Sequence, residues 1–331
     1  MTRTVFVTGG AGYVGSHCCK AFADAGWNVV VYDNLSRGWR DAVQWGDLIE
    51  GDILDLETLS SAMARTKPDT VAHFAALAYV GESVEDPEPY YRVNVGGTLN
   101  ILTAMRRNKI DKLVFSSTCA TYGPPVHIPI DESHPQAPIN PYGRSKLMAE
   151  WLLRDHADAY GMKHVALRYF NASGADPSGR IGERHEPETH LIPLALRGAG
   201  SNDFTLSVFG TDYETDDGTA IRDYIHVCDL ASAHLKALDY LRDGGKSMAV
   251  NLGTGRGTSV LEIRDAVQKV TGRNVQTEMR PRREGDPSRL VALPQKAWDV
   301  LGWKAERSDV DTVIQDAWTW HLAEEQRKKT R

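Results

Sequence analysis

Apolar and polar residues alternate with two different periods along the first half of the chain. Short β-branched runs that read as strands are residues 4–10, 27–33, 45–53, 70–76, 112–118 and 164–171. Segments with apolar residues at helical spacing lie between them, at residues 13–26, 56–66, 90–108 and 143–160. Strands that alternate with helices in this way are typical of βαβ units. The pattern therefore predicts a doubly wound α/β fold with a parallel sheet and right-handed crossovers.

The regular alternation ends after Asn171. The following residues, 172–220, are rich in Gly, Pro, Asp and Thr, and the later apolar segments are short. These later segments predict strands near 207–209 and 248–253 and helices near 259–271 and 308–324. We therefore predict a first domain of residues 1–171 and a smaller α/β lobe of residues 172–331, with segments such as 222–240 packing back on the first domain.

The composition is that of an ordinary globular protein, with 41% hydrophobic and 25% charged residues. A net charge of −6 argues against a general binder of nucleic acid or of anionic membranes. No segment approaches the roughly 20 apolar residues of a membrane span, and the N-terminus runs into a strand without a charged and apolar leader. The four cysteines lack CxxC spacing, which favours reduced thiols. We expect a cytoplasmic protein.

A glycine-rich turn follows the first predicted strand. The segment "TGGAGYVG" (8–15) contains Gly10-x-Gly12-x-x-Gly15 and also Gly9-x-x-Gly12. Glycines let the backbone approach a pyrophosphate closely, and the N-terminus of the next helix offers amides and a positive dipole end. A tight turn without a ligand is the alternative, but the strand–turn–helix context favours dinucleotide binding.

Carboxylates stand at the ends of the next two predicted strands. A carboxylate at Asp33 would accept hydrogen bonds from an adenosine ribose and repel a 2′-phosphate, which favours NAD over NADP, although Arg37 lies close in sequence. Asp52 and Ile53 follow the third strand, where adenine lies in this fold, so we predict adenine contacts there. A simple turn is the alternative for these two residues.

The segment "PYGRSK" (141–146) places Tyr142 and Lys146 at positions i and i+4 of a predicted helix, so they share one face. A phenol with a pKa of about 10 is a poor base at neutral pH. A nearby ammonium and the positive ring of an oxidised nicotinamide would favour the phenolate, which could then take a proton from an alcohol. The preceding strand ends in Ser116, Ser117 and Thr118, one of which could hydrogen-bond the substrate hydroxyl. The alternative is an exposed Tyr and Lys on a helix surface.

Six segments together resemble a known family. They are "TGGAGYVG", "SSTCATYG", "NPYGRSK", "LRYFNASGADPSGRIGE", "GTAIRDYIHVCDL" and "PRREGD". They resemble the extended short-chain dehydrogenase/reductase family and, within it, the UDP-glucose 4-epimerases, in order over nearly the whole chain. The resemblance implies a Rossmann domain with tightly bound NAD, a smaller UDP-sugar-binding lobe, and a homodimer that pairs the long helices at 90–108 and 143–160.

The reaction implied by the resemblance is reversible epimerisation at C4 of a UDP-hexose, either UDP-glucose or UDP-galactose. Tyr142 would remove the 4-hydroxyl proton while the nicotinamide takes the C4 hydride, and the hydride would return to the other face of a transient 4-keto sugar. Thr118 would be the hydroxyl partner of the base and Lys146 would assist it, although Ser117 is an alternative partner. These residues form the implied catalytic set.

Binding residues are carried over from the family's motifs as expectations. The implied NAD contacts are Gly9, Gly12, Tyr13, Val14, Gly15, Asp33, Asn34, Asp52, Ile53, Phe74, Ala75, Ala76, Asn94, Ser116, Tyr142, Lys146 and Tyr169. The implied UDP-sugar contacts are Thr118, Tyr142, Asn171, His190, Leu191, Ser207, Phe209, Arg222, Tyr224, Arg283, Asp286 and Leu290. Two of these, Arg222 and Arg283, would grip the diphosphate, for which a cationic fork is suited.

Three positions leave the sugar undecided. Ala78 stands where some relatives have lysine, and His190 stands where some have asparagine. Leu290 occupies a position at which tyrosine excludes N-acetylated sugars and small residues admit them, and leucine is intermediate. UDP-pentoses (xylose or arabinose) and UDP-N-acetylhexosamines therefore stay as alternative substrates.

Other activities fit the sequence less well. A UDP-sugar dehydratase needs acid–base carboxylates directly after the catalytic threonine, and related decarboxylases commonly place glutamate there. Thr118 is followed instead by Cys119 and Ala120. A non-enzymatic NAD-sensing protein usually lacks the tyrosine or the lysine of the catalytic pair, and both are present here.

A run of histidines and glutamates at residues 183–190 raises the question of a metal site. His185 and His190 are at i and i+5, a spacing that does not place two side chains on one helical face, and the segment has the composition of a loop. We therefore predict a solvated loop and no metal site.

Overall fold

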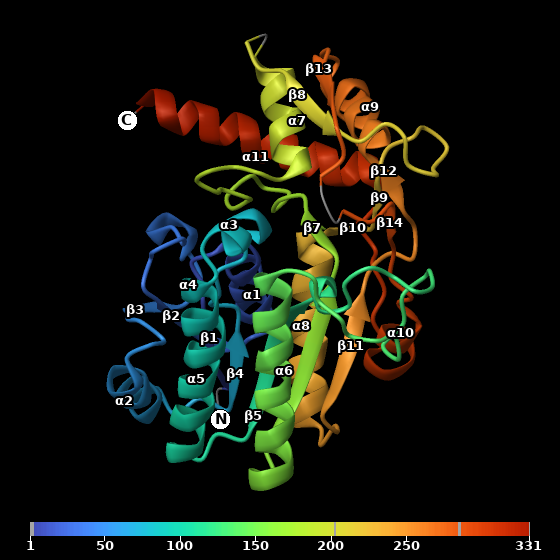
Figure 1. The fold of residues 1–331 in the computed structure, drawn as a ribbon. Helices are drawn as coiled ribbons and strands as arrows, with labels where there is room; N and C mark the ends of the chain where they lie inside the picture. Colours follow the sequence, from blue (N-terminus) through green and yellow to red (C-terminus); the bar gives the residue numbers. More distant parts are fainter. Residues whose placement is uncertain (1–2, 202, 284–285, 331) are drawn as a thin grey trace.

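The computed structural model describes residues 3–201, 203–283 and 286–330, and a seven-stranded parallel sheet forms its centre (Figure 1). In spatial order the strands are β11 (Met248–Leu252), β6 (Lys163–Tyr169), β5 (Lys112–Thr118), β4 (Thr70–His73), β1 (Thr4–Thr8), β2 (Asn28–Asp33) and β3 (Asp47–Glu50). This order reverses direction between β4 and β1, as in a doubly wound sheet. The predicted fold class is confirmed.

Helices cover both faces of the sheet because side chains alternate along each strand. Val5 and Val7 of β1 belong to the core on one face, whereas Phe6 belongs to the core on the other. The first face is covered by α1 (Tyr13–Asp24) and α8 (Val227–Arg242). The second face is covered by α2 (Leu56–Thr66), α5 (Gly97–Arg107) and α6 (Pro141–Tyr160). Figure 1 shows α5 and α6 side by side on the near face of the sheet, with α8 behind it.

The segment predicted as a helix at 90–108 is helical throughout residues 88–107, but its hydrogen-bond pattern changes along its length. It is divided into a single turn, α4 (Glu88–Tyr90), a π-helical turn at Tyr91–Gly96, and α5. Such turns insert an extra residue and often occur at functional sites. This one carries Asn94, whose side chain bonds to both the amide and the carbonyl of Leu77 and to the hydroxyl of Ser145.

A smaller lobe lies above the sheet in Figure 1 and has its own core. Its helices are α7 (Leu191–Gly200), α9 (Val260–Thr271) and α11 (Val310–Thr330), and its longer strands are β8 (Leu206–Phe209) and β13 (Thr277–Arg280). Shorter strands lie between the large sheet and the smaller lobe, namely β7 (Asn171–Ser173), β9 (Ile221–Arg222), β10 (Tyr224–His226), β12 (Thr258–Ser259) and β14 (Arg289–Leu290). The remaining short helices are α3 (Val80–Glu85), α10 (Gln295–Leu301) and the 3₁₀ turns Arg40–Ala42 and Cys119–Thr121.

The chain passes between the two lobes more than once. Although α8 and β11 come after residue 171, α8 packs on α1 and β11 pairs in parallel with β6 at the edge of the large sheet. The lobes are also joined near the glycine-rich turn, where the Tyr13 hydroxyl donates a hydrogen bond of 2.6 Å to the Gly174 carbonyl. Within the described ranges, no helix is both long enough and apolar enough to cross a bilayer.

Candidate active site

The glycine-rich turn is shaped so that only glycine fits at two of its positions. Gly9 has a φ of +76°, and a Cβ added there would lie 2.4 Å from the amide nitrogen of Ala75. A Cβ at Gly15 would lie 2.2 Å from the carbonyl oxygen of Gly9. Helix α1 begins after Gly12 with no side-chain cap and no acidic residue in its first turn. Free N-terminal amides beside a close-approach backbone form a cradle that suits the pyrophosphate of NAD.

Asp33 is held at the end of β2 by two backbone amides. Its Oδ2 accepts from Ala11 N at 3.0 Å and its Oδ1 accepts from Leu35 N at 2.8 Å. Burial raises the pKa of this carboxyl group and the two amide bonds oppose that rise. Each carboxylate oxygen has a second lone pair, so Asp33 can still accept from a ribose hydroxyl.

Arg37, which complicated the choice between NAD and NADP, has other partners. Its guanidinium donates to Glu82 at 2.7 Å and to the Glu186 carbonyl at 3.3 Å, and it lies over the Tyr79 ring at 5.2 Å. A guanidinium engaged in this way is not directed at a 2′-phosphate beside Asp33, which favours NAD.

The other predicted cofactor residues gather at the carboxyl edge of the sheet. Asn34 donates to Asp52 at 3.1 Å, and Ile53 is buried after β3. Phe74, Ala75 and Ala76 follow β4, with the Ala75 amide bonded to the Thr8 carbonyl at 3.1 Å. Val14 packs against the core beneath the turn. The sequence positions thus converge on one edge, where ligands bind in open α/β sheets.

The hydroxyl residues at the end of β5 point to opposite sides. The Ser116 hydroxyl shares a hydrogen bond of 2.7 Å with the Tyr169 hydroxyl at the end of β6. The Ser117 hydroxyl donates to the buried Glu150 carboxylate at 2.5 Å. The Thr118 hydroxyl lowers the pKa of the Tyr142 phenol, which places these two side chains near each other. Because the Ser117 hydroxyl is engaged by Glu150, Thr118 is the better candidate for the partner of Tyr142.

Tyr142 stands in the first turn of α6, which Asn140 caps by accepting from Gly143 N at 2.8 Å. Burial raises the pKa of the Tyr142 phenol, and the Thr118 hydrogen bond only partly opposes this. The protein groups alone therefore do not make the phenol a base at neutral pH. A positive charge brought by the oxidised nicotinamide is needed to favour the phenolate.

Lys146 lies one turn further along α6 and is buried. Burial lowers the pKa of its ammonium to about 7, against the opposing effect of Glu150. The ammonium lies over the Phe115 ring, 4.5 Å from its centroid. Glu150 is in turn fixed by Arg168, whose Nε and Nη2 donate to its two oxygens at 2.9 and 2.5 Å. Sequence reasoning missed this buried pair, because nothing in the local pattern links α6 to β6.

The predicted UDP-sugar residues form small groups around the lobe boundary. Arg222 donates to the Asp286 carboxylate, and strand pairing sets Leu290 directly opposite Arg222. The Arg283 guanidinium lies over the Phe209 ring, 4.2 Å from its centroid, on the strand that also carries Ser207. The remaining members are Asn171 and Tyr224, which are register partners in β7 and β10, and His190 and Leu191, which stand at the N-terminus of α7.

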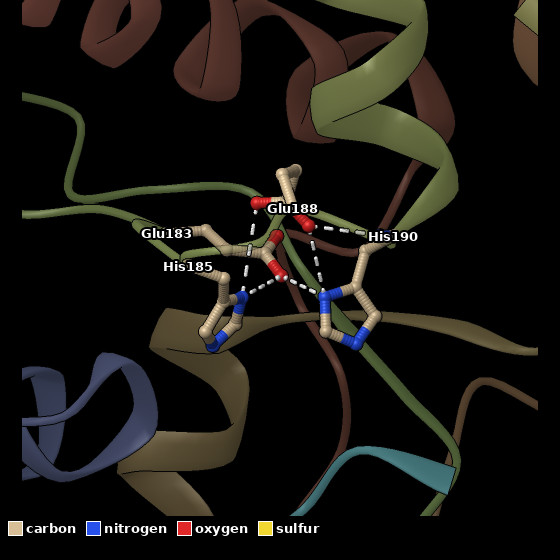
Figure 2. Close-up of side chains that lie close together, drawn as sticks. All are labelled: Glu183, His185, Glu188 and His190. Carbon is tan, nitrogen blue, oxygen red and sulfur yellow. Dashed lines mark hydrogen bonds and ion pairs between the residues drawn. The ribbon is translucent and has the colours of Figure 1, made fainter. Parts of the chain in front are cut away.

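The segment 183–190 is a loop, as the sequence predicted, but part of it is less solvated than expected. The side chains of Glu183, His185 and Glu188 are 8%, 22% and 20% exposed, and they converge with His190, whose side chain is 48% exposed (Figure 2). Although burial disfavours charged imidazoles, the two carboxylates raise the pKa of His185 to about 9 and that of His190 to about 10. The two imidazoles come together although i and i+5 do not share a helical face, because the segment is irregular and helical spacing does not apply to it.

Comparisons with known proteins agree over nearly the full length. Residues 5–253 match the family described as the NAD dependent epimerase/dehydratase family. The chain is 54% identical to a UDP-glucose 4-epimerase of Rhizobium meliloti (strain 1021) over 319 residues. This match covers 96% of this chain and 97% of the relative.

Two solved structures are similarly close. The crystal structure of UDP-glucose 4-epimerase from Brucella ovis in complex with NAD superposes with a TM-score of 0.94 at 56% identity, over 96% of this chain and 98% of that chain. The structure of a UDP-glucose-4-epimerase from Stenotrophomonas maltophila with bound NAD and formylated UDP-arabinopyranose has a TM-score of 0.95 at 40% identity, over 98% and 99% of the two chains.

Proposed function

The chain belongs to the NAD dependent epimerase/dehydratase family, and we propose that it interconverts UDP-glucose and UDP-galactose by epimerisation at C4. It is an NAD-dependent UDP-sugar 4-epimerase. The observation that carries the assignment is the position of Thr118 at the end of β5 and of Tyr142 at the start of α6, at the same edge of the sheet as the glycine cradle. A base and a dinucleotide site at one edge are what reversible oxidation of a sugar alcohol requires.

The cofactor side of the site would hold NAD with this chain's backbone and two acidic side chains. Gly9, Gly12 and Gly15 leave space for the pyrophosphate against the amides of α1, and Asp33 accepts from the adenosine ribose. Asp52 stands beside Asn34 at the expected position of the adenine. When bound, NAD supplies reversible acceptance of the hydride from C4.

The protein's part in the chemistry is to hold and move one proton. We propose that Tyr142 takes the proton of the sugar 4-hydroxyl and later returns it, while Thr118 fixes the phenol oxygen by a hydrogen bond. Lys146 is a nearby cation whose charge favours the phenolate. The 4-keto sugar formed in between turns over within the site and receives the hydride on its other face.

The UDP part of the substrate would be gripped in the smaller lobe. Arg222 and Arg283 offer two guanidinium groups to the diphosphate, and Asp286 offers a carboxylate to the uridine ribose. We accordingly propose that residues 1–171 bind the dinucleotide and residues 172–331 bind the nucleotide sugar, with α8 and β11 of the second part completing the large sheet.

Two long helices expose apolar side chains that support a homodimer. Leu99 on α5 and Trp151 and Tyr160 on α6 are 43%, 46% and 55% exposed. Large exposed apolar groups on adjacent helices are typical of protein interfaces. We propose that α5 and α6 pair with the same helices of a second copy, and light scattering that finds a monomer at micromolar concentration would reject this.

The unpaired state of the cysteines fits a protein that works in a reducing compartment. All four are free thiols, and Cys18 and Cys19 of α1 are buried in the core between this helix and the sheet. A chain of this size without disulfides is typical of proteins kept reduced, so we propose that it works in the cytoplasm. Fractionation that recovers it with extracytoplasmic markers would contradict the proposal.

The function is tested by proton NMR of UDP-galactose incubated with the purified protein and no added NAD. Appearance of UDP-glucose shows a 4-epimerase that carries its own cofactor. If the UDP-galactose spectrum stays unchanged after NAD is also supplied, the assignment to UDP-hexoses is wrong.

A further inference from the structure

Four metal-ligating side chains converge in the turn between the glycine-rich cradle and α7. Glu183, His185, Glu188 and His190 each offer one ligand atom, and these four atoms all lie within 4.8 Å of one another. Figure 2 shows both imidazoles directed at the carboxylates through their Nδ1 atoms. The proton and hydride transfers proposed above do not use this arrangement, although His190 is also one of the predicted UDP-sugar contacts.

The spacing of the four atoms matches that around a tetrahedral metal ion. The Glu183 oxygen Oε1 lies 3.2 Å from His185 Nδ1 and 2.8 Å from His190 Nδ1. Glu188 oxygens lie 3.7 Å from His185 Nδ1 and 3.3 Å from His190 Nδ1. Ligands at about 2.0–2.2 Å from a tetrahedral Zn²⁺ are separated from each other by roughly 3.3–3.6 Å. An ion can therefore be accommodated with small shifts of the side chains.

A second observation points to a missing ligand. The Nδ1 atom of His185 is buried and has no hydrogen-bond partner, although the Glu183 oxygen is only 3.2 Å away. Its position relative to the oxygen is therefore not that of an aligned N–H···O bond. Buried polar atoms are nearly always satisfied, and a nitrogen that faces two carboxylates without an aligned hydrogen bond is well placed to ligate a cation. A metal ion at the common centre of the four ligand atoms would accept the lone pair of His185 Nδ1 and so satisfy this nitrogen.

The charges around the cluster also favour a cation. Glu183 is 8% exposed, and among the described residues its ion pairs are with the two histidines. The neighbouring Arg184 is directed elsewhere, to Asp41 and Glu324. The two imidazoles, whose pKa values are raised, must lose their protons to act as ligands; two carboxylates with two neutral imidazoles then carry a charge of −2, which one divalent ion neutralises. Mixed imidazole and carboxylate ligands suit Zn²⁺ and its first-row neighbours.

We propose that Glu183, His185, Glu188 and His190 form a binding site for one divalent transition metal, with Zn²⁺ as the best fit. The ion is structural, because all four ligands of a tetrahedral site come from the protein and no position is left open. It would fix the turn between two parts of the active site. The His185 ring lies 6.3 Å from the Tyr13 ring of the cradle and 5.6 Å from the Tyr79 ring, and His190 directly precedes α7.

The first test measures metal binding by untagged protein that has been dialysed against a chelator. Isothermal titration with Zn²⁺ should show one site per chain, and Co²⁺ should give the intense visible absorption of a tetrahedral ion. Thermal unfolding should shift to higher temperature with Zn²⁺, since a ligand that binds only the folded state stabilises it. Absence of stoichiometric binding in the wild-type protein overturns the proposal, as does a weak, octahedral Co²⁺ spectrum.

Two conservative variants assign the ligands. Glu188→Gln and His185→Gln should each weaken Zn²⁺ binding at least about 100-fold. Loss of a residue that only supports a metal ligand costs up to about 100-fold, and loss of a ligand itself should cost no less. His127→Gln is the matched control, since His127 lies 3.8 Å from the carboxylate of Asp131 but belongs to no converging group of three or more ligand side chains among the described residues. Circular dichroism establishes that the variants are folded. Unchanged binding in both cluster variants, or loss of binding in the control, overturns the proposal.

Discussion

Replacing Arg168 with methionine should destabilise the protein by about 3–5 kcal/mol, because the change leaves a buried carboxylate without its counter-ion. The Arg168 and Glu150 side chains are only 6% and 7% exposed. Arg168 donates two hydrogen bonds to Glu150 and a third, of 2.9 Å, to the Tyr122 hydroxyl. The variant removes all three donors at once and keeps a side chain of similar length.

Removing both charges should cost much less than removing one. In the double variant Arg168→Met/Glu150→Gln the orphaned charge is absent, and Ser117 can still donate to the amide oxygen. Buried ion pairs add little over neutral groups of the same shape, so the double variant should lie within about 1–2 kcal/mol of the wild type. The difference between the single and double variants measures the penalty of an uncompensated charge rather than the strength of the pair.

The pH dependence has a definite sign. Burial would raise the pKa of Glu150, but Arg168 and Ser117 outweigh it and hold the pKa below its ordinary value. A lowered carboxyl pKa stabilises the fold above the unfolded pKa of about 4.3, and this stabilisation is lost as the pH falls through the folded pKa. Without Arg168 the buried carboxyl should instead protonate readily, so the deficit of the single variant should shrink between pH 8 and pH 5.

Urea unfolding followed by tryptophan fluorescence, with NAD held at a fixed concentration, measures all three proteins. Tyr122→Phe is a control for the lost phenol bond, and it should cost about 1 kcal/mol. The reasoning is refuted if the single variant loses less than about 1 kcal/mol, or if the double variant is as unstable as the single one.

Further changes test the site directly. Tyr142→Phe should lower kcat about 10³-fold, as expected for a lost acid–base group, while the ultraviolet absorbance of bound NAD is retained; a near-normal rate would contradict its role. Gly15→Ala should abolish NAD retention because its Cβ would meet the Gly9 carbonyl oxygen at 2.2 Å, whereas Gly81→Ala, in open space, should retain NAD measured after denaturation. Burial lowers the pKa of Lys146 to about 7. Below that pH the folded apo-protein carries a buried ammonium, which lowers the free energy of unfolding by its full amount, and this destabilisation decreases as the pH rises above about 7. Lys146→Met should therefore stabilise the apo-protein by about 3–5 kcal/mol at pH 6 and by less at pH 9 in urea titrations, with loss of turnover; equal effects at both pH values would be evidence against the shift. Trp151→Glu should convert the proposed dimer to a monomer in light scattering.

The parts of the fold that the sequence predicted are those set by local pattern. Alternating side chains such as Val5, Phe6 and Val7 identify a strand covered on both faces, and the structure places them in two different cores. The glycine turn is recognised from the spacing of its glycines between a strand and a helix. The crowding at Gly15 lies within the turn, whereas the crowding at Gly9 comes from Phe74 and Ala75 after β4.

The features that the sequence did not predict depend on distant partners. Local pattern does not connect Glu150 of α6 to Arg168 of β6, and the contact of Ser117 with that pair is what favours Thr118 as the partner of Tyr142. The predicted helix at 90–108 contains a π-helical turn because Asn94 is drawn to the backbone of Leu77, a contact with no helical period. The clustering of segment 183–190 was missed for the same reason, since helical spacing does not apply to a turn.

The place of β11 at the edge of the large sheet has a consequence for how the protein is made. Strand β6 ends at Tyr169, but β11, which pairs with the outer edge of β6, is complete only at Leu252. On the ribosome the growing chain therefore carries an open β6 edge, and an apolar sheet face awaiting α8, for much of its synthesis. Unpaired edges and exposed apolar faces are what chaperones bind and what aggregation begins from. A nascent chain stalled before residue 227 should thus be retained by chaperones, whereas release past residue 252 should let the sheet close.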